Sequence, residues 1–122
     1  MPRKILIVED DHNILISLDF LMRSENYDTR TAGTGNGALA IVGEFIPDLI
    51  LLDVMLPMMN GFEVCQTLRA NPALNALKIV MLTAKGRESE IAEGMASGAD
   101  AYITKPFATR DLVKIVKQLL GD

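Results

Sequence analysis

The chain has 122 residues, the length of a single domain, and because 49% of them are hydrophobic but only 5% aromatic, its core must be aliphatic. The net charge of −4, without a cluster of Lys and Arg, argues against a nucleic-acid-binding surface, and the single cysteine, Cys65, excludes an intramolecular disulfide and a cysteine metal site. No apolar run exceeds about five residues and no secretory signal is recognisable, so we expect a cytoplasmic protein without direct contact with nucleic acid or membrane.

Short apolar runs alternate with segments of helical periodicity along the chain. The runs predict strands at residues 5–8, 27–32, 49–52, 79–82 and 101–104. The other segments predict helices at residues 11–24, 35–45, from Gly61 onward, 88–97 and 111–120. Five strand–helix units in succession are typical of an α/β domain.

The composition of the strands predicts their order in the sheet. The second run alternates polar and apolar residues, which indicates an edge strand, whereas the third is fully apolar, which indicates a central strand buried on both faces. Right-handed crossovers then favour the order 2-1-3-4-5. We therefore predict one doubly wound, flavodoxin-like (βα)5 domain over residues 1–122, with a ligand site where the order reverses, between the first and third strands.

Two of the predicted helices have apolar residues whose placement can be named in advance. In the second helix, Leu39, Val42 and Ile46 lie on one side at helical spacing. The fourth helix has a weak pattern, and Ile91 and Met95 are its clearest candidates for the core.

Residues suited to phosphate chemistry end four of the predicted strands: Glu9 and Asp10 end the first, Asp53 the third, Thr83 the fourth and Lys105 the fifth. The carboxyl ends of parallel strands converge on one crevice, so we expect these side chains to meet. Carboxylates about 4 Å apart repel by roughly 4 kcal/mol at an effective dielectric near 20, and a bound cation relieves that repulsion. An oxygen-only site of this kind suits Mg²⁺.

This chemistry assigns a role to each group. A carboxylate beside a bound metal can attack a phosphoryl group, and Asp53, which ends the most buried strand, is the best nucleophile. The predicted metal ligands are Asp10, Glu9 directly or through water, Asp53, and the backbone carbonyl of Met55. Lys105 supplies an ammonium and Thr83 a hydroxyl to the phosphoryl oxygens. The alternative is that the acids following the first strand merely cap the first helix.

At these residues the chain resembles the receiver domain of two-component response regulators, over essentially its whole length. The matching segments are Ile-Leu-Ile-Val-Glu-Asp-Asp at 5–11, Asp-Val-Met-Leu-Pro-Met-Met-Asn-Gly at 53–61, Leu-Thr-Ala at 82–84, and Gly-Ala-Asp-Ala-Tyr-Ile-Thr-Lys-Pro-Phe at 98–107. The resemblance implies that Asp53 accepts phosphate from a phosphohistidine on a sensor kinase or phosphotransfer protein. It also implies an acidic Mg²⁺ pocket at Glu9 and Asp10 and a cis peptide between Lys105 and Pro106.

The resemblance further implies a phosphorylation-activated switch rather than a turnover enzyme. In such receivers the hydroxyl of the Thr83 position is drawn toward the phosphoryl group, and the aromatic residue, here Tyr102, turns inward. The output is a change in the face formed by the fourth helix, fifth strand and fifth helix, which would regulate an output domain or partner protein. Dimerisation through the same face is left open.

One hypothesis concerns the hydrolysis of the phosphorylated site, and two alternative functions are also open. Met55 and Lys85 flank the approach of an attacking water, and we hypothesise that they slow loss of the phosphoryl group. A Mg²⁺-dependent phosphatase of the haloacid-dehalogenase type would need similar residues, but it carries a D-x-D motif on its first strand, where this chain has Glu9-Asp10-Asp11. A bare interaction domain is the third alternative.

Three other signals have simpler explanations. The segment 33–38 matches G-x-G-x-x-A, a dinucleotide-binding pattern, but it follows the predicted edge strand and is better explained as turn glycines and a helix start. We expect His12 to be an exposed residue of the first helical turn. Cys65 is expected to be a small core side chain.

Overall fold

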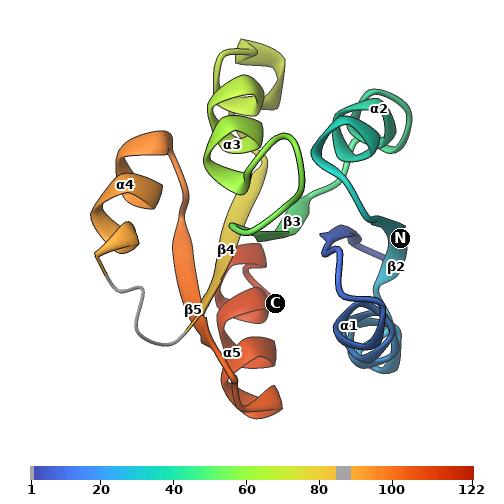
Figure 1. Ribbon diagram of the computed structural model, residues 1–122. Coiled ribbons are helices and arrows are strands. Elements are labelled where there is room, and N and C mark those ends of the chain that lie inside the picture. Colours follow the sequence, from blue (N-terminus) through green and yellow to red (C-terminus); the bar gives the residue numbers. More distant parts are fainter. Residues whose placement is uncertain (1, 85–88) are drawn as a thin grey trace.

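The computed structural model describes residues 2–84 and 89–122 and shows one parallel sheet with helices on both faces (Figure 1). The strands are β1 (Lys4–Val8), β2 (Asp28–Ala32), β3 (Leu49–Asp53), β4 (Lys78–Ala84) and β5 (Ala101–Lys105). The helices are α1 (His12–Ser24), α2 (Gly35–Phe45), α3 (Gly61–Arg69), α4 (Glu90–Ser97) and α5 (Thr109–Leu120), and a 3₁₀ turn covers Pro72–Leu74. The strand order is β2-β1-β3-β4-β5, which confirms the predicted architecture.

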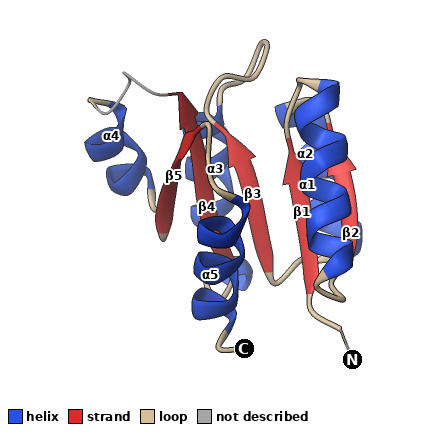
Figure 2. Ribbon diagram, turned by 90° about the horizontal axis from the view of Figure 1, so that it is seen from below, coloured by secondary structure: helices blue, strands red, loops and turns tan. Residues whose placement is uncertain are grey.

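The two faces of the sheet bury two separate aliphatic clusters. Successive strand residues point to opposite faces, so Leu6 and Val8 join one cluster while Ile5 and Ile7 join the other. Helices α1 and α5 cover the second cluster, and in Figure 2 both lie in front of the sheet. Helices α2, α3 and α4 lie on the opposite face (Figure 1). None of the helices in the described part of the chain is both long and apolar enough to span a membrane.

Burial along the strands follows their place in the sheet. All five residues of β3 are buried, as expected for a central strand, whereas β2 at the edge buries only Thr29 and Ala32. Strands β3, β4 and β5 are longer at their carboxyl ends than the apolar runs that predicted them. Asp53 and Lys105 are therefore the last residues of their strands, and the backbone ladder fixes their positions.

The prediction that Ile46 continues the side of the helix formed by Leu39 and Val42 is wrong. Helix α2 ends at Phe45, and Ile46 follows in the left-handed conformation with φ of 49° and its side chain 60% exposed. The chain must leave the helix before Pro47 to enter β3, which turns this side chain outward. Phe45 is buried instead, with Lys4 Nζ 5.5 Å and Arg30 Cζ 5.1 Å from its ring centroid.

The expected core face of the helix before β5 is also wrong. Ile91 and Met95 are 36% and 49% exposed, and the buried residues of α4 are Gly94 and Ser97. An apolar pattern identifies one face of a helix, but here the small residues take the inner face, and this lets α4 approach α3 and β5 closely. The larger apolar side chains therefore point outward.

The carboxyl end of α4 is fastened to α3 by side-chain hydrogen bonds. Arg69 donates from Nε to the Gly98 carbonyl (2.9 Å) and from Nη2 to Asp100 Oδ2 (2.7 Å). The buried thiol of Cys65 donates to the Ser97 carbonyl (3.3 Å). The backbone of the α4–β5 turn is thereby held in place from a neighbouring helix.

Candidate functional site

Three carboxylates gather at the carboxyl ends of β1 and β3, as the predicted strand order requires. Val8 pairs with Leu52, so the residues that follow them, Glu9 and Asp53, lie side by side at the carboxyl edge of the sheet. Ligand oxygens of Glu9, Asp10 and Asp53 all lie within 4.8 Å of one another. Glu9 and Asp53 are only 1% and 3% exposed, whereas Asp10 is exposed and open to solvent.

Lys105 supplies the cation of this cluster among the described residues. Its Nζ lies 2.8 Å from Glu9 Oε2 and 3.2 Å from Asp53 Oδ1, and it reaches the site from the end of β5. The Lys105–Pro106 peptide is cis, as the resemblance implies. One ammonium faces three carboxylates, which leaves an excess of negative charge.

Burial and mutual repulsion control the ionisation of Asp53. Loss of solvent and the charge of Glu9 raise the pKa of Asp53 from 3.8 to about 6, against the opposing effect of Lys105. For Lys105, burial alone would lower the pKa, but the hydrogen bond to Glu9 and the charge of Asp53 outweigh it and raise the pKa. The protein without bound metal therefore holds Asp53 in an unfavourable environment for a carboxylate.

This environment predicts an unusual pH dependence of stability in the absence of divalent cations. Folding raises the pKa of Asp53 from 3.8 to about 6. The protonated side chain therefore contributes to the free energy of unfolding, and this contribution is fully present below pH 3.8. That contribution is lost as the pH rises through about 6, by roughly 2–3 kcal/mol in total. Urea unfolding in EDTA between pH 4 and 7 measures this loss of stability in the wild type and in Asp53→Asn. The variant has no carboxyl group at position 53, so it should not show the loss. Parallel pH curves for the two proteins would contradict this assignment.

Two buried hydroxyls, one on β4 and one on β5, lack a hydrogen-bond partner among the described residues. They are Thr83 Oγ1, on a residue only 1% exposed, and the hydroxyl of Tyr102. Thr83 lies one residue beyond Leu82, the β4 partner of Asp53, and one residue before β4 ends at Ala84, so it lies toward the same carboxyl edge of the sheet. A buried hydroxyl without a partner costs about 1–3 kcal/mol, which marks both groups as candidates for a contact formed in another state.

The loop after β3 contributes backbone groups and one half-exposed side chain to the site. Met55 N donates to Asp53 Oδ1 (3.3 Å), and its side chain lines the pocket together with Asp11, Ile14 and Ala84. The role of the Met55 carbonyl as a metal ligand stays a prediction. Lys85 lies outside the described residues. The hypothesis about hydrolysis therefore also stays a prediction, which the acyl-phosphate lifetimes of Met55→Asn and Lys85→Glu would test.

Two residues that shape the site carry no chemical signal in the sequence. A Cβ atom on Gly61 would lie 2.5 Å from the Asp53 carbonyl oxygen, so only glycine lets α3 begin this close to the end of β3. Ile14, from α1, lines both the acidic pocket and a neighbouring groove of about 450 Å³ beside Pro106 and Phe107. The sequence pattern placed Gly61 at the start of a helix but did not indicate its contact with Asp53.

The positions of His12, Cys65 and the segment 33–38 agree with the simpler explanations given for them from the sequence. His12 is exposed in the first turn of α1, and Cys65 is buried in the core. The segment 33–38 starts α2, where Thr34 Oγ1 accepts from Gly37 N (3.0 Å), next to the edge strand and away from the point where the strand order reverses. That position does not suit a dinucleotide.

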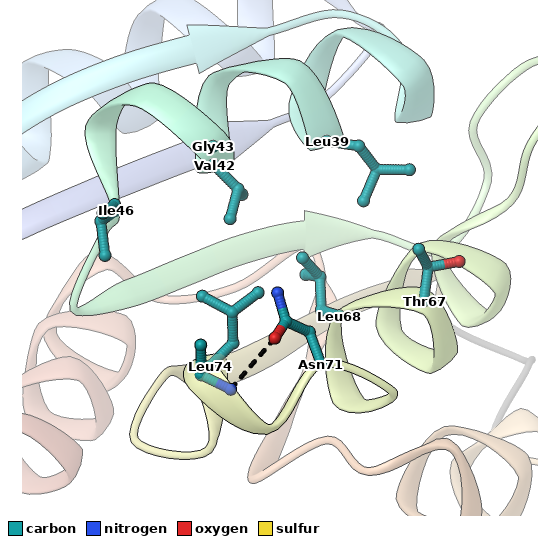
Figure 3. A pocket seen from close by; sticks show the side chains of 9 residues that line it. Leu39, Val42, Gly43, Ile46, Thr67, Leu68, Asn71 and Leu74 are labelled. Atoms are coloured by element: carbon teal, nitrogen blue, oxygen red, sulfur yellow. Dashed lines mark hydrogen bonds between the residues drawn. The ribbon is translucent and has the colours of Figure 1, made fainter.

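A second groove, of about 380 Å³, lies between α2 and α3 and does not share the chemistry of the acidic site. Figure 3 shows its lining, in which Leu39, Val42, Leu68 and Leu74 dominate. Among the residues that the structure describes, Thr67 and Asn71 are its only polar side chains, and no charged residue lines it. We assign no ligand to this groove.

The acidic cluster fits a hard divalent cation. Its donors are carboxylate oxygens alone, it carries more negative charge than Lys105 balances, and exposed Asp10 leaves a path for the ion. No histidine or cysteine belongs to the cluster within the described residues, so a softer transition metal is disfavoured. The donor set therefore suits Mg²⁺.

Comparison with known proteins gives a consistent picture. The family model described as response regulator receiver domain matches residues 5–117. The DNA-binding response regulator MtrA of Mycobacterium tuberculosis is 46% identical over 120 residues, 98% of this chain and 51% of that protein. The phosphate regulon transcriptional regulatory protein PhoB of Rhizobium meliloti is 42% identical over 98% of this chain and 53% of its own length. The chain thus spans about half the length of these relatives.

A solved structure shows the same fold over the whole chain. The chemotaxis response regulator CheY4 of Vibrio cholerae superposes with a TM-score of 0.91 at 30% identity, covering 98% of this chain and 99% of that one. It agrees with the five-stranded parallel sheet and the strand order described above.

Proposed function

The chain belongs to the family of response regulator receiver domains of two-component systems, and we propose that it accepts a phosphoryl group on Asp53 from a phosphohistidine. The donor would be a sensor histidine kinase or a histidine phosphotransfer protein. One observation carries the proposal: Asp53, buried at the end of the central strand, shares Lys105 with Glu9, and the carboxylate oxygens of Asp53, Glu9 and Asp10 lie within 4.8 Å of one another.

The residues divide the chemistry between them. An Asp53 carboxylate oxygen attacks the phosphorus, the phosphorus–nitrogen bond of the donor breaks, and the electron pair passes to the imidazole, which takes up a proton. Glu9, Asp10, Asp53 and the Met55 carbonyl would hold Mg²⁺, which when bound neutralises phosphoryl charge. The Lys105 ammonium neutralises further charge on the phosphoryl oxygens. Thr83 Oγ1, which has no partner now among the described residues, donates to one of them.

Signal output would follow from that last contact. Movement of Thr83 toward the phosphoryl group makes room for Tyr102, and the face of α4, β5 and α5 changes to regulate an output domain or a partner protein. The named relatives are about twice as long, and MtrA is described as DNA-binding. If this receiver controls DNA binding, we propose that a separate domain or protein contacts the DNA, because this chain carries a net charge of −4. A cytoplasmic location is part of the proposal, and dimerisation through the same face stays open.

Incubation with acetyl phosphate and Mg²⁺ separates this function from a phosphatase. We expect at most one phosphoryl group per chain, in a base-labile adduct, and no sustained turnover of small phosphomonoesters. The complete set of acid, hydroxyl and ammonium argues against a bare interaction domain, which would form no adduct. Steady release of phosphate from phosphomonoesters would instead favour the phosphatase.

A further inference from the structure

Tyr102 packs against the backbone of α4 at a position that has no side chain. A Cβ atom on Gly94 would lie 3.5 Å from both Cζ and the hydroxyl oxygen of Tyr102, and 3.3 Å from Cε1 of Phe62. The 3.5 Å distances to Tyr102 are ordinary van der Waals contacts, and the 3.3 Å distance to Phe62 is already tight. Any atom beyond Cβ would therefore compete with the tyrosine ring for the space between α4, α3 and β5.

Helix α4 is poorly placed to yield that space. Gly94 O accepts from Ala99 N (3.2 Å), which ties it to the α4–β5 turn. Arg69 and Cys65 of α3 hold that turn through the carbonyls of Gly98 and Ser97. Phe62 is buried in the core, whereas Tyr102 lies on the edge strand β5 and is partly exposed. Of the two neighbouring rings, Tyr102 is therefore the one that can move.

We propose that Gly94 is a positioning residue of the switch, because its missing side chain forms the slot that admits the Tyr102 ring. This inference rests on the proposed function for its biological meaning but not for its geometry. Gly94 acts only through Tyr102 and lies outside the acidic site. A larger residue at this position would hold the ring outward and uncouple it from Asp53.

Replacing Gly94 by Leu tests the slot directly. The chain has two tyrosines, so fluorotyrosine labelling gives two ¹⁹F resonances, which Tyr102→Phe assigns. A soluble gadolinium chelate then reports how exposed each ring is. We expect the relaxation enhancement of Tyr102 to rise several-fold in Gly94→Leu, while buried Tyr27 stays unchanged as an internal reference. The Tyr102 resonance should also stop responding to acetyl phosphate, although Asp53 is still phosphorylated.

Gly43→Leu is the matched control, since Gly43 is an exposed glycine of α2 at which an added Cβ would have no neighbouring atom within 4 Å. It should leave the Tyr102 resonance and its response as in the wild type. If Gly94→Leu does not fold, Gly94→Val decides, because its methyl groups extend beyond the Cβ position that already contacts Tyr102 at 3.5 Å and should raise the exposure of Tyr102 measurably. A Tyr102 ring that stays protected and responsive in a folded Gly94 variant would overturn the inference. Absence of any Asp53 adduct in the wild type would instead overturn the proposed function.

Discussion

Asp53→Asn is expected to abolish the phosphoryl adduct completely and at the same time to make the metal-free protein more stable. The first effect follows because an amide is not a nucleophile for phosphoryl transfer. The second follows because burial and Glu9 raise the pKa of Asp53 to about 6, so its carboxylate is held at pH 7 against its intrinsic preference. The free energy of unfolding of Asp53→Asn in EDTA should exceed that of the wild type by roughly 2–3 kcal/mol. A functional group that destabilises its own fold is what a strained site predicts.

Mass spectrometry after acetyl phosphate treatment and urea unfolding in EDTA measure the two effects. Asp11→Asn is the matched control, because Asp11 lines the same pocket but only caps α1, where its Oδ1 accepts from Asn13 N (3.0 Å). Asparagine caps helices as well as aspartate does, so this variant should keep both the adduct and its stability. An adduct that persists in Asp53→Asn would reassign the acceptor.

Lys105→Met is expected to change two properties in opposite directions. Phosphorylation should slow by about 10²–10³-fold, because one preorganised charge facing the phosphoryl oxygens is lost. Affinity for Mg²⁺ should rise, by about tenfold or more, because the ammonium 2.8 Å from Glu9 and 3.2 Å from Asp53 competes with the metal for the same carboxylates. In EDTA the variant should lose about 3–5 kcal/mol of stability, since two buried carboxylates are left without their cation.

Calorimetric titration with Mg²⁺ and the rate of labelling by acetyl phosphate test the two directions separately. Lys117→Met is the control, because Lys117 is 45% exposed and pairs with Glu25 (2.8 Å) far along α5 from the site. Exposed pairs contribute at most about 1 kcal/mol, so the control should match the wild type in all three measurements. Weaker binding of Mg²⁺ by Lys105→Met would show that the lysine does not compete with the metal.

The acidic site was largely predictable because strand ends in a parallel sheet converge. The alternation at residues 27–32 placed that strand at the edge, and the apolar run before Asp53 placed this residue on a central strand. Lys105 was predictable for the same reason. What the sequence could not give is the state of these groups: the raised pKa of Asp53 depends on how completely the fold excludes water from it.

The α4 region shows where sequence patterns fail. Ile91 and Met95 have the right spacing for a core face, yet Gly94 and Ser97 occupy it, because the close approach of α3 and β5 leaves room only for small residues. The contacts of Arg69 were equally invisible, since they depend on carbonyls that only the folded chain brings together. Helical periodicity reports which residues share a face but not how near the neighbouring element lies.

Mapping the phosphoryl adduct on the wild-type chain tests the central claim most directly. The chain is treated with acetyl phosphate in Mg²⁺ and in EDTA, the acyl phosphate is reduced with borohydride, and the peptides are sequenced by mass spectrometry. We predict a single reduced residue, at position 53, formed in Mg²⁺ and missing in EDTA. A reduced residue elsewhere, or labelling that does not depend on the metal, would contradict a site in which Glu9, Asp10 and Asp53 gather a divalent cation beside the acceptor.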